Sequence, residues 1–156
     1  KAISNLNKRI KLNLLIIGDG EEKKNILKYI IKNKLQKVVK IIKFQKNPYP
    51  YLKRSDTLVL SSLYEGLPNV LIEALALKKF VISSNCQTGP KEILANQKYG
   101  SLFNVKDHLK LEEKIYDFYK NKKKLRKKTL LAFNSLDRFD FNKNCTIYLN
   151  IVKEYL

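Results

Sequence analysis

The chain has 156 residues, of which 44% are hydrophobic and 29% charged, a composition that suits one globular domain. No apolar run approaches the roughly 18 residues that a membrane-spanning helix needs. A single His and two widely separated Cys argue against a zinc cluster and against a His-dependent catalytic triad. The cysteine usage fits a cytoplasmic, reducing location.

The formal net charge of +18 arises mostly from Lys, which supplies 28 of the 32 basic residues. One interpretation is a solvated, Lys-rich surface with no partner. The other is a summed positive field that attracts polyanions or the anionic inner face of a membrane. No Arg cluster is present, and aromatic and basic residues do not alternate, so specific recognition of nucleic acid is not expected.

Short apolar segments alternate with helical patterns along the chain. Strands are predicted at residues 11–17, 38–44, 57–60, 80–83 and 101–103. Helices are predicted at residues 21–33, 51–55, 68–77, 91–95, 107–120, 122–135 and 141–155, the last with an apolar stripe expected to dock on the domain. This alternation predicts an α/β fold with a doubly wound, Rossmann-like parallel sheet, whose ligands bind beyond the carboxyl ends of the strands.

One such end, residues 61–74 (SSLYEGLPNVLIEA), has the features of an anion site. The segment leaves a strand, turns at Gly66 and enters a helix with Pro68 expected at the first helical position. The first backbone N–H groups of that helix, near Asn69, Val70 and Leu71, then have no partner inside the helix and suit a phosphate. Gly66 allows the backbone to approach a ligand closely.

Two carboxylates, Glu65 and Glu73, frame this site. Glu73 lies on the same side of the helix as Asn69, in otherwise apolar surroundings, so we expect its carboxylate to have a partner. A phosphate would repel it, whereas the vicinal hydroxyls of a sugar can donate to both carboxylates. The pattern therefore favours a sugar–phosphate ligand; the alternative is that Glu65 caps the helix and Glu73 pairs with a nearby Lys.

Residues 65–73 resemble the E-x7-E motif of the retaining, nucleotide-sugar-dependent glycosyltransferases of family four, which have the GT-B fold. Three further segments resemble that family in the same order: LLIIGDG at 14–20, KRSDTLVL at 53–60 and FVISSNCQTGPKEIL at 80–94. The resemblance spans residues 10–105. It implies a single donor-binding domain over residues 1–156, with its α/β core at 10–105 and C-terminal helices at 106–156.

The resemblance also implies individual roles. Glu65 would be the catalytic residue that holds hydroxyls of the donor sugar, and Glu73 would bind the ribose. The full implied donor-binding set is Gly18, Phe44, Gln45, Lys46, Ser62, Glu65, Gly66, Leu67, Asn69, Val70 and Glu73. The implied donor is a nucleoside-diphosphate sugar, best matched by a UDP-sugar; no cofactor or metal is expected, because paired Glu suit hydroxyls and no Asp-x-Asp occurs.

Two departures from the family pattern stand out. Family members open this domain with a strand carrying Gly-Arg and a following Lys, preceded by an acceptor-binding domain, and neither is recognisable here. We therefore expect the C-terminal half of a GT-B enzyme, with the first strand and the N-terminal domain missing, inactive alone, from a cytoplasmic enzyme of glycan or lipopolysaccharide-type synthesis. The alternatives are a non-catalytic sugar-nucleotide binding module and a basic polyanion-binding domain.

Overall fold

The computed structural model describes residues 1–155, and its five strands form two parallel ladders. In the first, β1 (Leu14–Ile17) pairs with β2 (Val39–Ile42). In the second, β4 (Phe80–Ser84) lies between β3 (Thr57–Leu60) and β5 (Ser101–Phe103). The α/β fold with parallel strands is as predicted, and among the described strands no ladder joins β1 to β3.

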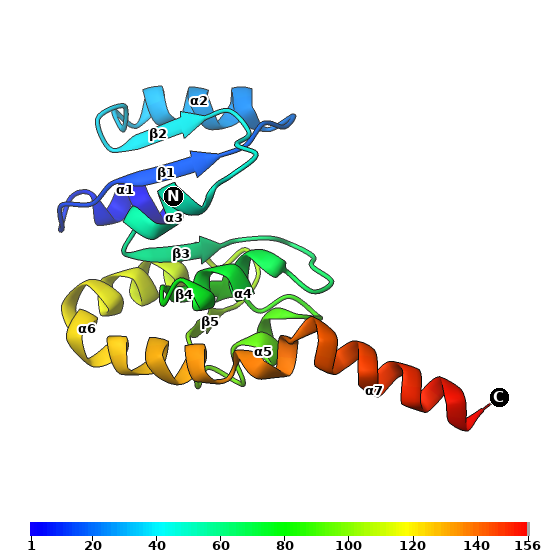
Figure 1. The fold of residues 1–156 in the computed structure, drawn as a ribbon. Helices are drawn as coiled ribbons and strands as arrows, with labels where there is room; N and C mark the ends of the chain where they lie inside the picture. Colours follow the sequence, from blue (N-terminus) through cyan, green and yellow to red (C-terminus); the bar gives the residue numbers. More distant parts are fainter. Residues whose placement is uncertain (156) are drawn as a thin grey trace.

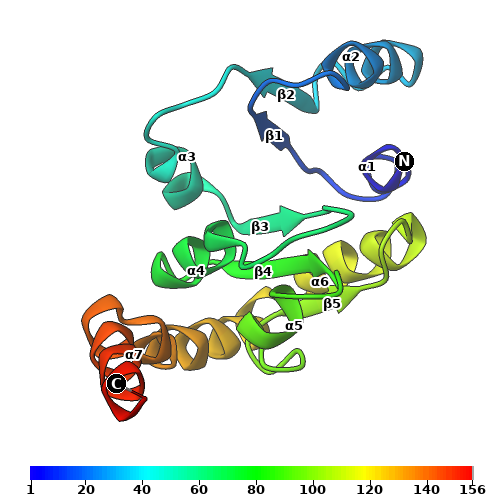
Figure 2. The same cartoon turned by 90° about the vertical axis from the view of Figure 1, so that its right-hand side faces the viewer.

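The strands alternate with helices that lie on both sides of the sheets (Figures 1 and 2). The helical elements are α1 (Ala2–Leu6), α2 (Lys23–Lys32), α3 (Tyr49–Arg54), α4 (Asn69–Ala76), α5 (Pro90–Ile93), α6 (His108–Asn134), the 3-10 helix η1 (Leu136–Phe139) and α7 (Phe141–Glu154). The sequence reasoning missed the two short elements α1 and η1. The break predicted near residue 121 is a kink in α6, where Asn121 leaves helical geometry.

The core lies around β4, whose five residues are all buried, since both of its edges are paired and helices cover both of its faces. On one face, Leu71 and Leu75 of α4 are fully buried in a cluster that includes Val81 of β4. On the other face, the rings of Phe80 and Phe118 stack with their centroids 5.2 Å apart. This packing fixes α4, and with it the turn that precedes α4.

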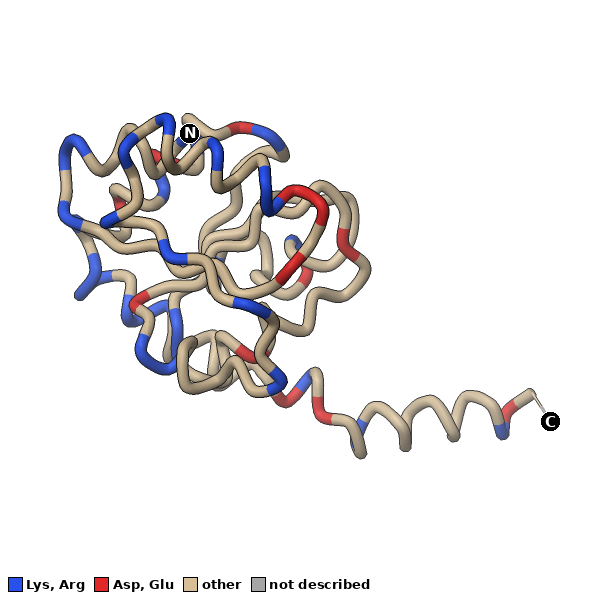
Figure 3. The backbone as a smooth tube through the Cα atoms, turned by 90° about the horizontal axis from the view of Figure 1, so that it is seen from above, with Lys and Arg blue, Asp and Glu red and all other residues tan. Residues whose placement is uncertain are grey.

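The last helix, α7, does not dock as predicted. It has no buried residue and contacts the rest of the chain mainly through η1, so it projects from the domain as an arm (Figures 1 and 3). Its apolar residues remain exposed, including Phe141 at 78% and Tyr148 at 67%. The stripe was identified correctly, but the described part of the chain offers no surface for it. None of the helices within residues 1–155 combines the length and hydrophobicity that crossing a bilayer requires.

Candidate functional site

The candidate site begins where β3 ends and α4 starts. Pro68 is the N-cap of α4 in an extended conformation, one position earlier than predicted, and no side chain caps the helix. Of the three amides predicted to be free, that of Leu71 is not, because it donates to the carbonyl of Pro68 at 2.9 Å. Within residues 1–155 the amides of Asn69 and Val70 have no acceptor. Two free N–H groups at the positive end of a helix dipole form an anion site.

The two carboxylates beside this helix end are also free. Glu65 and Glu73 are both half-buried, and neither carboxylate forms a hydrogen bond or an ion pair with any other described residue. The alternative in which Glu65 caps the helix and Glu73 pairs with a Lys is therefore wrong. Each carboxylate retains its acceptor capacity for groups that donate hydrogen bonds.

Side chains at the end of β4 and in the loop that follows it hold the turn in place. The hydroxyl of Ser84 and the thiol of Cys86 both donate to the carbonyl of Ser62, at 2.7 and 3.2 Å. The hydroxyl of Thr88 donates to the carbonyl of Glu65 at 2.5 Å. The sequence reasoning assigned no role to these three residues, although it placed their loop on the same rim; the only signal was the presence of short polar side chains at a strand end.

A close backbone approach fixes the same turn. Gly89 has φ = +83°, and a Cβ added there would lie 2.2 Å from the carbonyl oxygen of Gly66 and 2.5 Å from Cδ of Pro68. Only glycine permits both this conformation and this contact. Together with the three side-chain bonds, the contact holds the backbone between Ser62 and Pro68 against the second sheet.

The other predicted residues gather at the ends of β1 and β2. Gly18 follows β1 with φ = +139°, and the Asp19 carboxylate next to it accepts from the Phe44 amide at 3.4 Å and pairs with Lys23. The bond from Lys23 and that from the Phe44 amide lower the pKa of Asp19 below 3.8. The Phe44 ring is 74% exposed and thus available for stacking.

Gln45 and Lys46 follow Phe44 in the chain. The amide of Gln45 donates to the carbonyl of Lys43 at 3.1 Å, and its carbonyl oxygen accepts from the Tyr51 hydroxyl at 3.4 Å. The structure therefore groups Gly18, Phe44, Gln45 and Lys46 at the end of the first sheet, and the other seven predicted residues at the end of the second.

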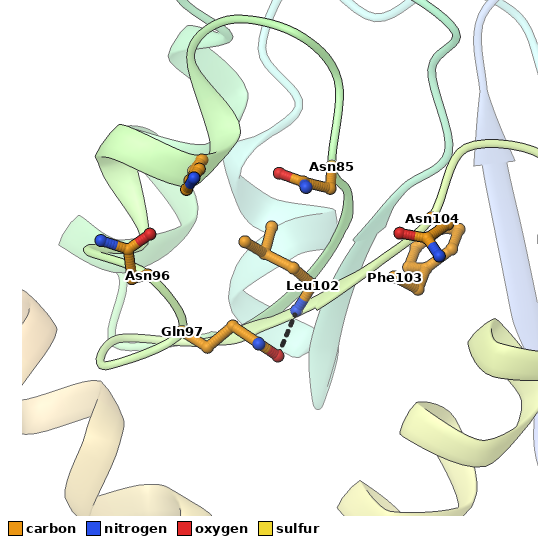
Figure 4. Close-up of a pocket in the computed structure, with 7 residues that line it drawn as sticks. Asn85, Asn96, Gln97, Leu102, Phe103 and Asn104 are labelled. Atoms are coloured by element: carbon orange, nitrogen blue, oxygen red, sulfur yellow. Dashed lines mark hydrogen bonds between the residues drawn. The ribbon is translucent and has the colours of Figure 1, made fainter.

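A polar hollow that the sequence reasoning did not predict lies at the β4–β5 end of the rim (Figure 4). Its volume is about 190 Å³. It is lined by Asn85, Lys91, Asn96, Gln97, Leu102, Phe103 and Asn104. Gln97 is held there because its side-chain oxygen accepts from the Leu102 amide at 3.1 Å. Irregular loops give such carboxamides no periodic pattern that a sequence could show.

Parallel α/β sheets with free amides at the start of a helix on the carboxyl rim define a class of nucleotide-binding domains. The family model described as "Glycosyl transferases group 1" matches residues 1–129, and the chain belongs to this family. Its α/β fold is that of the GT-B glycosyltransferases, as predicted.

Two relatives and one solved structure illustrate the similarity. An uncharacterized glycosyltransferase of Methanocaldococcus jannaschii is 53% identical over 81 residues, 52% of this chain and 20% of that protein. The Campylobacter jejuni N-acetylgalactosamine-N,N'-diacetylbacillosaminyl-diphospho-undecaprenol 4-alpha-N-acetylgalactosaminyltransferase is 31% identical over 126 residues, 75% of this chain and 34% of that protein. Anabaena HepE in complex with UDP superimposes with a TM-score of 0.85 at 18% identity, over 97% of this chain and 44% of that one. The chain thus matches less than half the length of each of these proteins.

Proposed function

We propose that this chain is the donor-binding domain of a retaining glycosyltransferase of family four, and that Glu65 and Glu73 are its E-x7-E motif. One observation carries the proposal: on a single turn and helix lie two amides and two carboxylates that have no partner among residues 1–155. A nucleoside-diphosphate sugar carries both complementary groups, a diphosphate for the amides and hydroxyls for the carboxylates. A bare polyanion would satisfy the amides and be repelled by the acids.

In this arrangement each part of the donor has its own contact. The diphosphate accepts from Asn69 and Val70, the ribose hydroxyls donate to Glu73, and the sugar hydroxyls donate to Glu65. Gly66 and Leu67 contact the sugar and phosphate through the backbone. Ser62 supports that turn, and Phe44, Gln45 and Lys46 adjoin the base, with Gly18 beneath. The solved UDP complex of a protein with the same fold supports uracil as the base.

The chemistry follows from the helix end. As the bond between the anomeric carbon and the diphosphate breaks, negative charge grows on the leaving oxygen, and preorganised N–H groups at a helix N-terminus stabilise it. The acceptor hydroxyl attacks the anomeric carbon with net retention, the bond from that carbon to the diphosphate oxygen breaks, and the proton of the hydroxyl passes to the departing diphosphate. The carboxylates of Glu65 and Glu73 accept hydrogen bonds from the sugar and ribose hydroxyls. We therefore propose that donor binding needs no metal or other cofactor.

The remaining partners are proposals of the same kind. The acceptor would be a glycan or a lipid-linked saccharide, since a relative is named for transfer to a diphospho-undecaprenol saccharide. An N-terminal domain elsewhere in the polypeptide would bind this acceptor, and the enzyme would act in the cytoplasm. The Lys-rich surface, spread over much of the domain (Figure 3), would favour contact with an anionic membrane at its inner face.

Calorimetric titration with UDP tests the proposal. Glu73→Gln should weaken UDP binding about 10-fold or more, because a hydrogen bond to a charged group is worth about 1.5–3 kcal/mol. For 2′,3′-dideoxy-UDP, which lacks the ribose hydroxyls, this variant and the wild type should have the same affinity. Glu113→Gln, which removes an exposed carboxylate of α6, is the matched control. Equal UDP affinity in wild type and Glu73→Gln would refute the ribose role.

A second arm addresses Glu65. Glu65→Gln should leave UDP affinity unchanged and weaken the binding of a UDP-sugar, because only the sugar reaches that carboxylate. Heparin, a bare polyanion, should compete poorly with UDP. Strong heparin binding with a steep salt dependence, together with weak UDP binding, would favour a polyanion-binding domain instead.

A further inference from the structure

A second cavity, with a volume of about 80 Å³, opens at the edge of the second sheet where β3 and β4 begin. The segment before β3, the turn between α4 and β4, and the helix α6 all line it. We call it the basic cavity and define it by its charged residues: Asp56, Lys78, Lys79, Lys122 and Arg126. Parallel strands begin at one edge of a sheet and end at the other, so the basic cavity and the candidate site lie at opposite edges (Figure 1).

The basic cavity has an excess of positive charge. Four cationic side chains line it beside a single carboxylate, that of Asp56, so three positive charges are not neutralised there. Asp56 forms an ion pair with Lys122. Among the described residues no carboxylate pairs with Lys78, Lys79 or Arg126.

One of these cations, Lys79, has a structural role that accounts for its position. Its ammonium group donates to the carbonyls of Lys53 and Ser55, at 2.6 and 2.9 Å. These two bonds tie the end of α3 to the start of β4, and a cation is favourable at the C-terminal end of a helix. Lys79 is therefore a wall of the basic cavity, and the remaining cations need another explanation.

Lys78 and Arg126 have no such structural role. The Lys78 ammonium lies 4.4 Å from the centroid of the Phe133 ring, and this contact leaves its N–H groups without an acceptor in the described part of the chain. The end of α4 does not need this ammonium, because the carbonyls of Ala74 and Leu75 accept from backbone amides. The guanidinium of Arg126 forms no ion pair within residues 1–155. Both cations thus retain donors for a ligand.

The floor of the basic cavity is apolar and buried. Phe80 and Phe118, whose rings stack, line it and are only 2% and 7% exposed. Apolar material beneath a group of like charges strengthens their field relative to that of the same charges on an open surface. The cations therefore repel one another, and an anion between them would remove this repulsion. In this respect the basic cavity differs from the solvated Lys residues elsewhere on the surface.

The remaining hydrogen-bond donors select a charged ligand. The hydroxyls of Ser55 and Thr129 also line the cavity, but they already donate to backbone carbonyls, at 2.8 and 2.7 Å. The donors left over are cationic and suit an oxyanion, and a guanidinium can bind two oxygens of one phosphate. The cavity is also far smaller than the roughly 300 Å³ at which pockets for drug-sized molecules begin, so it admits a phosphoryl group and not a nucleotide.

From these observations we propose that the basic cavity binds one phosphoryl group, with Arg126, Lys78 and Lys122 as its donors. The group belongs either to inorganic phosphate or to a phospholipid headgroup whose remainder stays outside the cavity. This site is separate from the proposed donor site, because it shares no residue with the turn at Glu65 or with the start of α4.

Nuclear magnetic resonance of the arginine side chains tests the proposal on the full-length protein. Inorganic phosphate is added at constant ionic strength, so that general screening of charge stays the same. The Nε–Hε signal of Arg126 should shift and then saturate. That of Arg138 should not move, because its guanidinium already donates to two backbone carbonyls. The amides of Asn69 and Val70 report any phosphate bound at the donor site separately.

Two variants show whether the site is specific. Arg126→Gln should weaken phosphate binding, followed by the backbone amide of Lys78, at least about 10-fold, because hydrogen bonds between charged groups are strong. Lys127→Gln is the matched control: it removes one charge from the next, exposed position of α6, outside the cavity, and should bind phosphate as the wild type does. An Arg126 signal that does not respond would overturn the proposal, and so would equal weakening in both variants, which indicates attraction by net charge alone.

Sedimentation with phosphatidylglycerol vesicles distinguishes the two sources of the phosphoryl group. If a headgroup occupies the cavity, Arg126→Gln should sediment with the vesicles less than Lys127→Gln does, and inorganic phosphate should compete with the vesicles. Equal sedimentation of the two variants, together with the phosphate response of Arg126, identifies the free ion as the ligand. Failure of the phosphate titration leaves the UDP titrations unaffected, so the two proposals fail independently.

Discussion

Replacing Gly89 with Ala should destabilise the domain and disturb the candidate site together. The added Cβ would lie 2.2 Å from the Gly66 carbonyl oxygen and 2.5 Å from Pro68 Cδ, and both partners belong to the turn that precedes α4. The backbone at Gly89, with φ = +83° and ψ = −71°, is in addition strained for any residue with a side chain.

The magnitude follows from these two effects. A strained backbone conformation costs about 1–3 kcal/mol, and forcing an extra carbon into packed structure costs about 1–3 kcal/mol more. Gly89→Ala should therefore lower the free energy of unfolding by about 2–6 kcal/mol, a large part of the stability of an ordinary domain. The clash is with backbone and with a proline ring, so no flexible side chain can move aside.

Urea denaturation followed by circular dichroism measures this loss. Gly20→Ala is the matched control, because a Cβ at Gly20 meets nothing within 4 Å and the residue has no positive φ. If Gly89→Ala unfolds at the same urea concentration as wild type, Gly89 does not pack against the turn at Gly66 and Pro68 as described. If the variant folds, its UDP affinity should also fall, because the turn that carries Gly66 must shift.

Three further substitutions give expected outcomes. Gly66→Ala should leave the free energy of unfolding unchanged within about 0.5 kcal/mol, since nothing lies within 4 Å of the added carbon. It should nevertheless weaken UDP-sugar binding in calorimetry. Unchanged binding would refute the close approach of the ligand to the backbone at Gly66. Phe118→Ala should cost about 3–5 kcal/mol in urea denaturation by emptying the stack on Phe80, whereas Tyr119→Ala, exposed at the next position, should cost little. Asp19→Asn should lower the free energy of unfolding at neutral pH but not in acid. Because the pKa of Asp19 is lowered in the folded state, the unfolded state binds the proton more readily. The extra stability of the wild type over the variant is therefore full above pH 3.8 and disappears as the pH falls through the lowered pKa. Equal wild-type and Asp19→Asn stabilities at neutral pH would contradict the bond between the ends of β1 and β2.

The local pattern of apolar and turn-forming residues was sufficient to predict most of the helices and strands. The strands at 57–60 and 101–103 were predicted with their observed bounds, since apolar runs between turn residues determine them. The strand predicted at 11–17 is shorter, because residues 11–13 precede the ladder with β2. Helix α1 was missed because five residues are too few to show a helical period.

The sequence pattern could not predict contacts between residues that lie far apart in the chain. Free amides at the start of α4 were predicted from Pro68 and the strand before it; the structure agrees for Asn69 and Val70 but not for Leu71, whose amide donates to Pro68. The bonds from Ser84, Cys86 and Thr88 join residues more than 20 positions apart, and no spacing within the sequence encodes such a bond. The division into two ladders likewise depends on which strands find a neighbour, which strand composition alone does not determine.

The projecting helix α7 has a consequence for how the chain unfolds. Helices of about 14 residues are marginal in water unless packing supports them, and α7 gains almost none. Heating should therefore melt α7 well before the strands, so that ellipticity declines gradually before the cooperative loss of tertiary structure. A two-state fit to the whole curve would then misstate the enthalpy of the domain.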